Sequence, residues 1–439
     1  MSLSPRGHFD QPLSVLLSAA GGLLFLCLTC WKAMGLGDIP SRLPVVLALF
    51  LLFLFSFIIL LGENGPSEGV LRALLPIGLA LFLRAALLDH VTYDYLDFLS
   101  QWTAFFRENG GWAAFSRPVG NYTVTYLYFL AAISYLPVRD LYLIKLFSIL
   151  FDMLLAWGGY RLVRTLTGRS GPRPLAAFCL LLLLPTVVLN GACWGQCDSI
   201  YTALCLHALA SALEKRPAAS VVLLALAFSF KLQTVFLLPL WCALWFSKRV
   251  GFRHLLLFPL TEFLVILPAL QLGKPLGDIL SVYLGQTAEY SGYLTMNAPS
   301  LYSLIPQGAA VNTALAARLG ILSAFLFTAA LLLWLFLHRN RLTSGALTAA
   351  AAALAIGIPL LLPHMHDRYF FPADVLTLTR AAGGHRQTLP AVFTQVASLG
   401  AYHAYLMLRY AFPMSWGALL LTAALVLTLW DLFRETALG

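Results

Sequence analysis

Apolar segments recur along almost the whole of this 439-residue chain, and only short polar stretches separate them. Hydrophobic residues make up 60% of the chain and charged residues 11%, whereas a soluble domain is about 45–50% apolar and about 25% charged. Because a helix needs roughly 20 apolar residues to cross a bilayer, the sequence predicts an all-α polytopic membrane protein with about 14 transmembrane helices. The predicted spans are 13–33, 43–61, 70–88, 142–163, 175–189, 200–213, 218–230, 234–246, 255–272, 314–337, 346–362, 369–379, 391–408 and 419–432.

The charge distribution orients these spans. The net charge is +9, but the basic residues fall in short loops between apolar segments, which is the positive-inside pattern. With the N-terminus inside, the basic loops all lie on one side, which predicts a multi-pass protein of the cell (plasma) membrane with cytoplasmic N- and C-termini. The basic clusters lie within 161–173, 215–216, 248–253, 339–341 and 380–386. No nucleic-acid motif is present, so we expect the lipid bilayer, and no nucleic acid, as a partner.

The segment 121–136 is apolar enough to span, but a span here would place the basic cluster at 161–173 outside and invert every later loop. We interpret it as an interfacial helix in a large first external loop, with its tyrosines at the depth of the lipid headgroups. These tyrosines are Tyr122, Tyr126, Tyr128 and Tyr135. The predicted regions are N-terminal transmembrane helices (1–88), a first external loop (89–141), a central transmembrane module (142–272), a second external loop (273–312) and C-terminal transmembrane helices (313–439).

Four polar segments interrupt the apolar background, and the predicted topology places all of them on the outer side. In the first, Asp94 and Asp97 follow the third span and precede Trp102. An aspartate there could take a proton from an acceptor hydroxyl as a general base, or it could be a solvated loop acid or a helix cap. The second segment runs from Trp194 to Asp198. It either binds a sugar by stacking and hydrogen bonds, or it is a polar turn whose tryptophan anchors it at the level of the lipid headgroups.

The third segment contains Lys231 on the outer side, against the positive-inside trend. A cation there suggests an anionic partner such as a lipid phosphate, and snorkelling to the interface is the alternative. The fourth, 363–369, holds two histidines, an aspartate and an arginine at membrane depth, where ionisable groups commonly mark a site. His366 and Arg368 are donors suited to a phosphate, and a plain interfacial polar turn is the alternative. Two histidines spaced by one residue are too few to predict a metal site.

These segments, in this order, resemble those of GT-C superfamily glycosyltransferases. They are similar in particular to the bacterial family described as similar to the eukaryotic GPI-anchor mannosyltransferase that adds the second mannose. A weaker likeness extends to the eukaryotic dolichyl-phosphate-glucose-dependent glucosyltransferases. The stretches that carry the resemblance are 94–102, 120–123, 194–198, 230–233 and 364–370. This chain departs from the family pattern at Asp367, where glutamate is more usual, and at Thr123-Val124, which replaces a proline-containing stretch.

The resemblance implies a GT-C-type fold and an inverting glycosyltransferase that needs no metal or cofactor. A hexose, mannose in preference to glucose, would pass from a polyprenyl-phosphate-linked sugar donor to an acceptor hydroxyl on the extracytoplasmic side. Asp94, the first acid after the third span, would be the catalytic base. The residues expected to bind the donor phosphate are Lys231, His364, His366 and Arg368. Those expected to contact the sugar or the acceptor are Asp97, Trp102, Tyr122, Trp194, Gln196, Asp198, Gln233, Asp367 and Tyr369.

A transporter or flippase of lipid-linked sugars is the alternative, because it would also need outward cations and aromatic gates. The two halves of the chain show no internal repeat, which many transporter folds have. The ionisable residues also cluster at one face, except for Asp152 and Glu262, which lie inside predicted spans. A third possibility is a non-catalytic assembly subunit, which would not need a base in the first loop.

Overall fold

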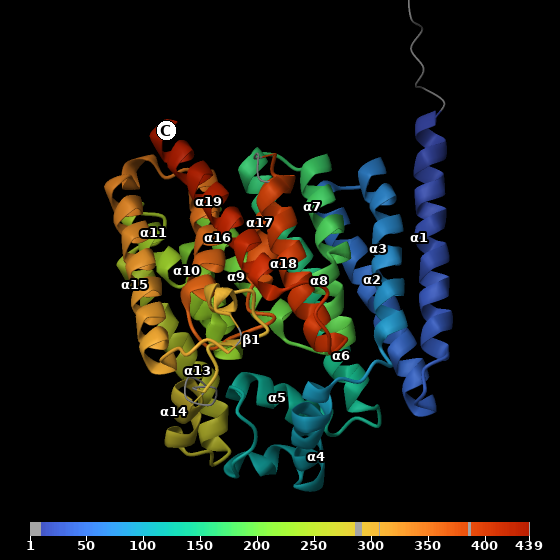
Figure 1. The fold of residues 1–439 in the computed structure, drawn as a ribbon. Coiled ribbons are helices and arrows are strands. Elements are labelled where there is room, and N and C mark those ends of the chain that lie inside the picture. The colour runs from blue at the N-terminus through green and yellow to red at the C-terminus, as the bar shows by residue number, and fades with distance from the viewer. Residues whose placement is uncertain (1–9, 286–291, 307, 385–387, 439) are drawn as a thin grey trace, which may run out of the picture.

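The computed structural model describes residues 10–285, 292–306, 308–384 and 388–438, and it is a predominantly helical bundle (Figure 1). In this part of the chain, eight helices are long and apolar enough to cross a membrane, or nine if a bent pair counts as one span. The protein is therefore membrane-embedded and mainly α-helical, as the sequence predicts. The spanning helices are α1 (Asp10–Met34), α2 (Arg42–Asn64), α3 (Glu68–Leu87), α6 (Asp140–Thr167), α13 (Leu257–Gln271) with the short α12 (Phe252–Leu255) before it, α15 (Thr313–Leu337), α16 (Ser344–Leu361) and α19 (Met414–Leu438).

The bent pair replaces the predicted span 175–189. Its first part is α7 (Pro172–Leu183), and its second part is α8 (Pro185–Val188) continued by the π-helical turn η4 (Leu189–Trp194), with a bend of 48° between them. The cause is Pro185, which has no N–H to donate and forces the preceding Leu184 into an extended conformation. The bend carries the chain to Trp194, in the second of the polar segments.

The predicted total of about 14 spans is not confirmed. Several predicted spans are shorter helices of 8 to 16 residues, and the segment 234–246 is divided between a 3₁₀ turn and a helix. Most residues of α9 are buried, so this helix lies inside the protein and need not cover the bilayer thickness. These elements are α9 (Asp198–Leu213), α10 (Pro217–Phe230), η5 (Leu232–Phe236), α11 (Pro239–Phe246) and α17 (Phe371–Ala382). The longer α18 (Thr388–Leu406) is not among the candidate spans either.

Ion pairs connect the helix ends at which the predicted basic clusters lie. Arg164 near the end of α6 contacts Glu63 near the end of α2 and Glu214 after α9, and Arg380 in α17 contacts Glu435 in α19. Figure 1 shows this end of the bundle at the top and the helices of the two predicted external loops at the bottom. Residues 385–387, in the last basic cluster, lie outside the described residues, as do 1–9 and, in the second loop, 286–291 and 307.

The first predicted external loop folds into η2 (Tyr95–Leu99), α4 (Ser100–Glu108), η3 (Gly111–Ser116) and α5 (Val124–Ile133). The ten-residue α5 is too short to cross a membrane, and it packs against α4, α10 and α13. One prediction here is wrong, because Tyr126 is buried against the protein interior instead of lying at the depth of the lipid headgroups. Tyr135, after α5, is exposed.

The second predicted external loop contains α14 (Leu276–Gly285), β1 (Thr295–Met296) and η6 (Leu301–Leu304). β1 pairs in parallel with β2 (Met365–His366), with Thr295 opposite Met365. This pairing ties the second loop to the segment 363–369, so two regions that the sequence separates by about 70 residues lie side by side. The remaining short elements are η1 (Ile39–Ser41) and η7 (Arg339–Arg341).

Candidate active site

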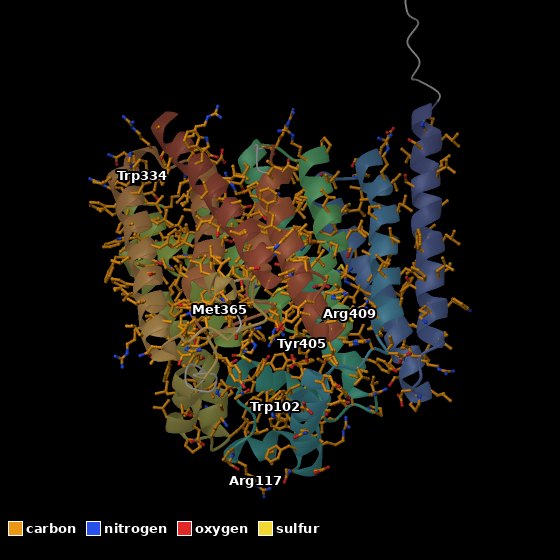
Figure 2. All side chains as sticks on the ribbon, viewed as in Figure 1. Trp102, Arg117, Trp334, Met365, Tyr405 and Arg409 are labelled. Atoms are coloured by element: carbon orange, nitrogen blue, oxygen red, sulfur yellow. The ribbon has the colours of Figure 1, made fainter. Side chains whose placement is uncertain are left out.

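A pocket of about 220 Å³ opens between the helical bundle and the two predicted external loops. Figure 2 shows Trp102, Met365 and Tyr405 near this junction. The lining side chains come from the first loop, the turn after η4, the β1 and β2 strands and α18. They are Asp94, Phe98, Leu99, Trp102, Asn121, Tyr122, Gln196, Met296, Asn297, His366, Asp367, Arg368 and Tyr405.

The Asp94 carboxylate is held through one of its two oxygens. Its Oδ2 accepts hydrogen bonds from Trp194 Nε1 at 2.8 Å and from Gln196 Nε2 at 2.6 Å. Its backbone N–H, which has no partner within the first helical turn, donates to the Tyr405 hydroxyl at 3.1 Å. Trp194 and Gln196 both contact Oδ2, so neither of them covers Oδ1.

Local backbone geometry brings Trp194 and Gln196 to the same carboxylate oxygen. Gly195, between them, has φ of 78°, a left-handed conformation that side chains disfavour. It follows the π-helical turn η4, and a second π-helical turn, η2, begins directly after Asp94. Such turns are rare and often found at functional sites. The two polar segments are therefore joined where both helices depart from regular α-geometry.

Arg368 is the cation of the pocket. Its guanidinium nitrogens lie 3.7 Å from Asp94 Oδ2, 3.6 Å from Asp198 Oδ2 and 3.6 Å from Asp367 Oδ1, and its Cζ lies 5.3 Å from the centre of the Trp194 ring. Burial would lower its pKa, but the three carboxylates raise that pKa well above the ordinary value, so the group stays charged. These distances exceed hydrogen-bond length, and Nε has no hydrogen-bond partner among the described residues. Arg368 therefore has donors left for a ligand.

Lys231 and Asp198 form an ion pair behind the pocket. Lys231, where the chain leaves α10 in an extended conformation, donates from Nζ to Asp198 Oδ1 at 2.5 Å. Asn190 Nδ2 donates to Asp198 Oδ2 at 2.8 Å and to the Tyr402 hydroxyl at 2.9 Å. Asp198 is fully buried and neither member of the ion pair lines the pocket. The pair thus neutralises a buried carboxylate that would otherwise depend on Arg368 alone.

His366 and Asp367 line the pocket with shifted pKa values. Burial, together with the charges of Arg368 and Lys231, lowers the pKa of His366 to about 3, so the imidazole is neutral at neutral pH. Burial raises the pKa of Asp367 to about 7, and Arg368 opposes that rise. His366 therefore brings no charge to the pocket, while Asp367 changes charge near neutrality.

The structure brings most of the predicted site residues together. Those that line the pocket are Asp94, Trp102, Tyr122, Gln196, His366, Asp367 and Arg368. Trp194, Lys231 and Asp198 act on these through the contacts given above, and the Tyr369 ring lies 5.1 Å from that of His366. No group of three or more potential metal ligands occurs in the part of the chain that the structure describes.

Three predicted residues lie apart from the pocket. Asp97 is exposed and does not line it. Gln233 is buried outside it. His364 does not line the pocket either. Its backbone N–H donates to the Leu294 carbonyl at 2.9 Å, and its ring contacts the Tyr293 carbonyl. His364 therefore fastens the second predicted external loop to the segment 363–369.

Several residues that complete the site were not predicted. Tyr402 and Tyr405 lie three residues apart on α18, a spacing that puts them on the same side of a helix. Tyr405 stacks on Trp194 with ring centres 4.1 Å apart, and Tyr402 meets the same ring edge-on. Asn190 is a polar residue within an apolar run, and Asn297 lines the pocket from the second loop. The tyrosine spacing and the isolated Asn190 were the signals available in the sequence.

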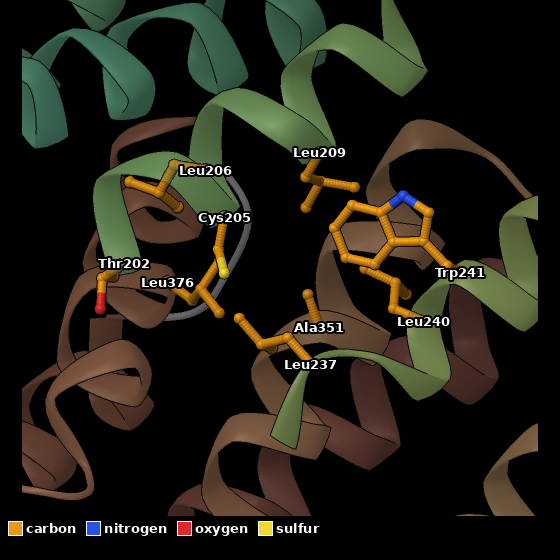
Figure 3. Close-up of a pocket in the computed structure, with 9 residues that line it drawn as sticks. All are labelled: Thr202, Cys205, Leu206, Leu209, Leu237, Leu240, Trp241, Ala351 and Leu376. Carbon is orange, nitrogen blue, oxygen red and sulfur yellow. The ribbon is translucent and has the colours of Figure 1, made fainter. Parts of the chain in front are cut away.

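A second cavity, of about 10 Å³, lies between α9, α11 and α16 (Figure 3). Its walls are Leu206, Leu209, Leu237, Leu240, Trp241 and their neighbours, and they carry no charge. The space is about that of one water molecule and offers few polar partners. We regard it as a packing gap in the interior and not as a ligand site.

A family model described as alpha-(1->6)-mannopyranosyltransferase, N-terminal domain, matches residues 101–247, about a third of the chain. No individually curated protein matches the chain. The match supports a glycosyltransferase that moves mannose and is of the GT-C type. It includes Trp102, the turn at 194–198 and Lys231, whereas Asp94 and the segment 363–369 lie outside it. The likeness to the GPI-anchor mannosyltransferase stays a prediction from the motifs.

The buried ion pair gives a stability prediction. Replacement of Lys231 by Met leaves the Asp198 carboxylate buried without its closest cation, and breaking a buried pair in this way costs about 3–5 kcal/mol. We expect Lys231→Met to lower the melting temperature of the detergent-solubilised protein strongly. The double variant Lys231→Met/Asp198→Asn, which removes both charges, should recover part of the loss. A Lys231→Met protein as stable as the wild type would contradict this account of the pair.

Proposed function

We propose that this protein transfers mannose from a polyprenyl-phosphate donor to an acceptor hydroxyl in a single displacement that inverts the anomeric centre. The observation that carries the proposal is that a carboxylate and a guanidinium from distant parts of the chain, Asp94 and Arg368, line one pocket 3.7 Å apart. The family match supports mannose as the sugar. The polyprenyl-phosphate donor follows from the resemblance and from the cation in the pocket.

In this mechanism Asp94 is the general base. Its Oδ1 takes the proton of the acceptor hydroxyl while the acceptor oxygen forms a bond to the anomeric carbon of mannose. Trp194 and Gln196 hold Oδ2 by hydrogen bonds, so they orient the carboxylate without blocking its second oxygen. General-base catalysis of this kind is worth about 10²–10⁴-fold in rate.

Arg368 stabilises the departing group in the same step. The bond between the anomeric carbon and the phosphate oxygen breaks, and its electron pair leaves with the polyprenyl phosphate, whose negative charge increases by one. A fixed guanidinium in a poorly hydrated pocket stabilises that charge as it develops. Lys231 acts as a positioning residue in this scheme, because its partner is Asp198 and it does not line the pocket.

The remaining pocket walls suit a sugar ring. Phe98, Trp102 and Tyr122 form a chain of ring contacts, with centres 5.9 Å and 5.2 Å apart, and all three line the pocket. Aromatic faces of this kind can stack on the apolar face of a hexose, while His366 and Asn297 can hydrogen-bond its hydroxyls. The pocket volume of about 220 Å³ leaves no room for a polyprenyl chain, which would extend into the bilayer.

The proposed orientation places the pocket outside the cell. The predicted basic clusters lie at the end of the bundle opposite the pocket, and basic loops face the cytoplasm in most membrane proteins. By this rule both termini are cytoplasmic and the pocket is extracytoplasmic. A polyprenyl-phosphate sugar on the outer leaflet could then reach it from the side of the bundle.

The transporter alternative is not favoured. Asp152, one of the two acids inside predicted spans, pairs with Arg84 at 2.9 Å, and both side chains are fully buried. Ser199 donates a further hydrogen bond to the same carboxylate. Asp152 thus joins α3, α6 and the start of α9, which is a structural role and not a place on a transport path. Glu262 stands apart from this network, on α13.

A pair of neighbouring aspartates tests the assignment of the base. Asp94→Asn should lower the rate of mannose transfer about 10²–10⁴-fold with the fold intact, because asparagine keeps the shape but cannot accept the proton. Asp97→Asn, three residues away and exposed, should transfer at the wild-type rate. The assay uses purified protein, labelled polyprenyl-phosphate mannose and an alkyl α-mannoside acceptor. Near-normal turnover by Asp94→Asn would remove Asp94 from the mechanism.

Asp367 gives a prediction about pH. Because its pKa in the folded protein is about 7, the group is protonated below that pH and negative above it. The negative form, 3.6 Å from Arg368, opposes an anionic phosphate at that guanidinium. The KM for the donor should therefore rise as the pH increases through about 7, and Asp367→Asn should flatten this rise. His366 does not titrate in this range. An unchanged pH profile in Asp367→Asn would contradict the assignment.

A further inference from the structure

A second polar pocket, of about 300 Å³, lies at the end of the bundle opposite the candidate active site. One wall is the turn after α11, with Phe246, Ser247, Lys248 and Arg249, and the other is the connection between α15 and α16, including Arg339. Figure 2 labels Trp334 near this end of α15. The candidate span α15 ends at Leu337, and another candidate span begins at Phe252, shortly after α11. The pocket therefore lies where two spans reach the membrane surface.

The pocket is positively charged and its charge is not compensated. Lys248, Arg249 and Arg339 line it, and no carboxylate of the described residues lies within 4 Å of their charged groups. The acids at this end of the bundle pair elsewhere: Glu63 and Glu214 with Arg164, and the acids of α19 with Arg380. Three cations around one hollow favour an anionic ligand.

Aromatic side chains lie directly below this hollow. Phe246 packs edge-on against Phe336 with ring centres 5.1 Å apart, and Trp245 contacts both Phe246 and Phe252. Trp245, Phe252 and Phe336 are exposed. Exposed aromatic rings at the ends of spans mark the level of the lipid headgroups. The cations thus lie at the depth of lipid phosphates, with an apolar surface beneath them for acyl chains.

The two arginines of the pocket, Arg249 and Arg339, are held in place by the protein. Arg249 donates to the Leu342 carbonyl at 3.2 Å and so joins the two walls of the pocket. Arg339 donates to the Phe336 carbonyl at 3.0 Å, and its guanidinium lies 4.5 Å from the centre of the Phe336 ring. A site whose side chains are already ordered loses less entropy when a ligand binds.

We propose that this pocket binds the headgroup phosphate of an anionic phospholipid, with an acyl chain against the aromatic surface formed by Trp245, Phe246, Phe252 and Phe336. Lys248 and Arg339 supply the charge, and Arg249 keeps the two walls together. The proposal does not depend on sugar transfer, because the pocket lies at the other end of the bundle. Basic pockets between spans are a known means of recognising acidic lipid headgroups.

The test measures lipid binding by native mass spectrometry of the full-length protein in detergent. The probes are phosphatidylglycerol and phosphatidylcholine with identical acyl chains. The wild type should retain one phosphatidylglycerol at least about ten-fold more tightly than phosphatidylcholine. Lys248→Gln/Arg339→Gln, which preserves the Arg249 link, should weaken phosphatidylglycerol about 30-fold, the scale expected for two basic residues at a membrane surface. Phosphatidylcholine binding should not change.

Lys215→Gln/Arg169→Gln is the matched control. Both residues are exposed and lie in predicted basic clusters at the same end, and Lys215 has φ of 62° where Lys248 has 58°. This control should bind phosphatidylglycerol as the wild type does. Equal binding of the two lipids, or no loss in Lys248→Gln/Arg339→Gln, would overturn the proposal. Inorganic phosphate that binds the wild type as tightly as phosphatidylglycerol would show a free-anion site and overturn the lipid assignment, whether or not the variants fold.

Discussion

The interior of this protein depends on the interaction of the Arg368 guanidinium with three carboxylates. The guanidinium lies 3.6–3.7 Å from the carboxylates of Asp94, Asp198 and Asp367, which come from the first predicted external loop, the start of α9 and the segment between α16 and α17. An ion buried without a partner costs several kcal/mol, so these segments are stable in the interior only together. Lys231 neutralises the charge of Asp198. The positive charge of Arg368 can therefore act on Asp94 and on a ligand in the pocket.

The four polar segments could be identified from the sequence because each interrupts an otherwise apolar chain. Charged and aromatic residues stand out at the ends of apolar spans, so Asp94, Trp194 and Arg368 were identified without any knowledge of the fold. The choice of Asp94 over Asp97 rested on the resemblance, which implies the first acid after the span, and the structure places Asp94 in the pocket and Asp97 outside it. The sequence also predicted that these segments belong to one site.

The ion-pair partners and the protonation states of the site residues could not be predicted, because they depend on burial and on contacts between distant parts of the chain. Lys231 was identified as a cation for a phosphate, but its partner Asp198 is 33 residues away and was assigned a different role. His366 was expected to bind the phosphate, and burial together with the charges of Arg368 and Lys231 lowers its pKa and keeps it neutral. The predicted number of spans is not confirmed, because α9, α10 and α11 are as apolar as the candidate spans. They are shorter, and α9 in particular is covered by other helices instead of lipid.

The central claim is that the guanidinium of Arg368 and the carboxylate of Asp94 act on the two sides of one anomeric carbon. The most direct measurement is an electron cryo-microscopy structure of the protein with a mannosyl phosphonate analogue of the polyprenyl donor. The account predicts the phosphonate within hydrogen-bond distance of Arg368 and the mannose ring between it and Asp94, against Trp102. A phosphonate bound away from this pocket, or a sugar that leaves Asp94 on the same side of the anomeric carbon as the phosphonate, would contradict it.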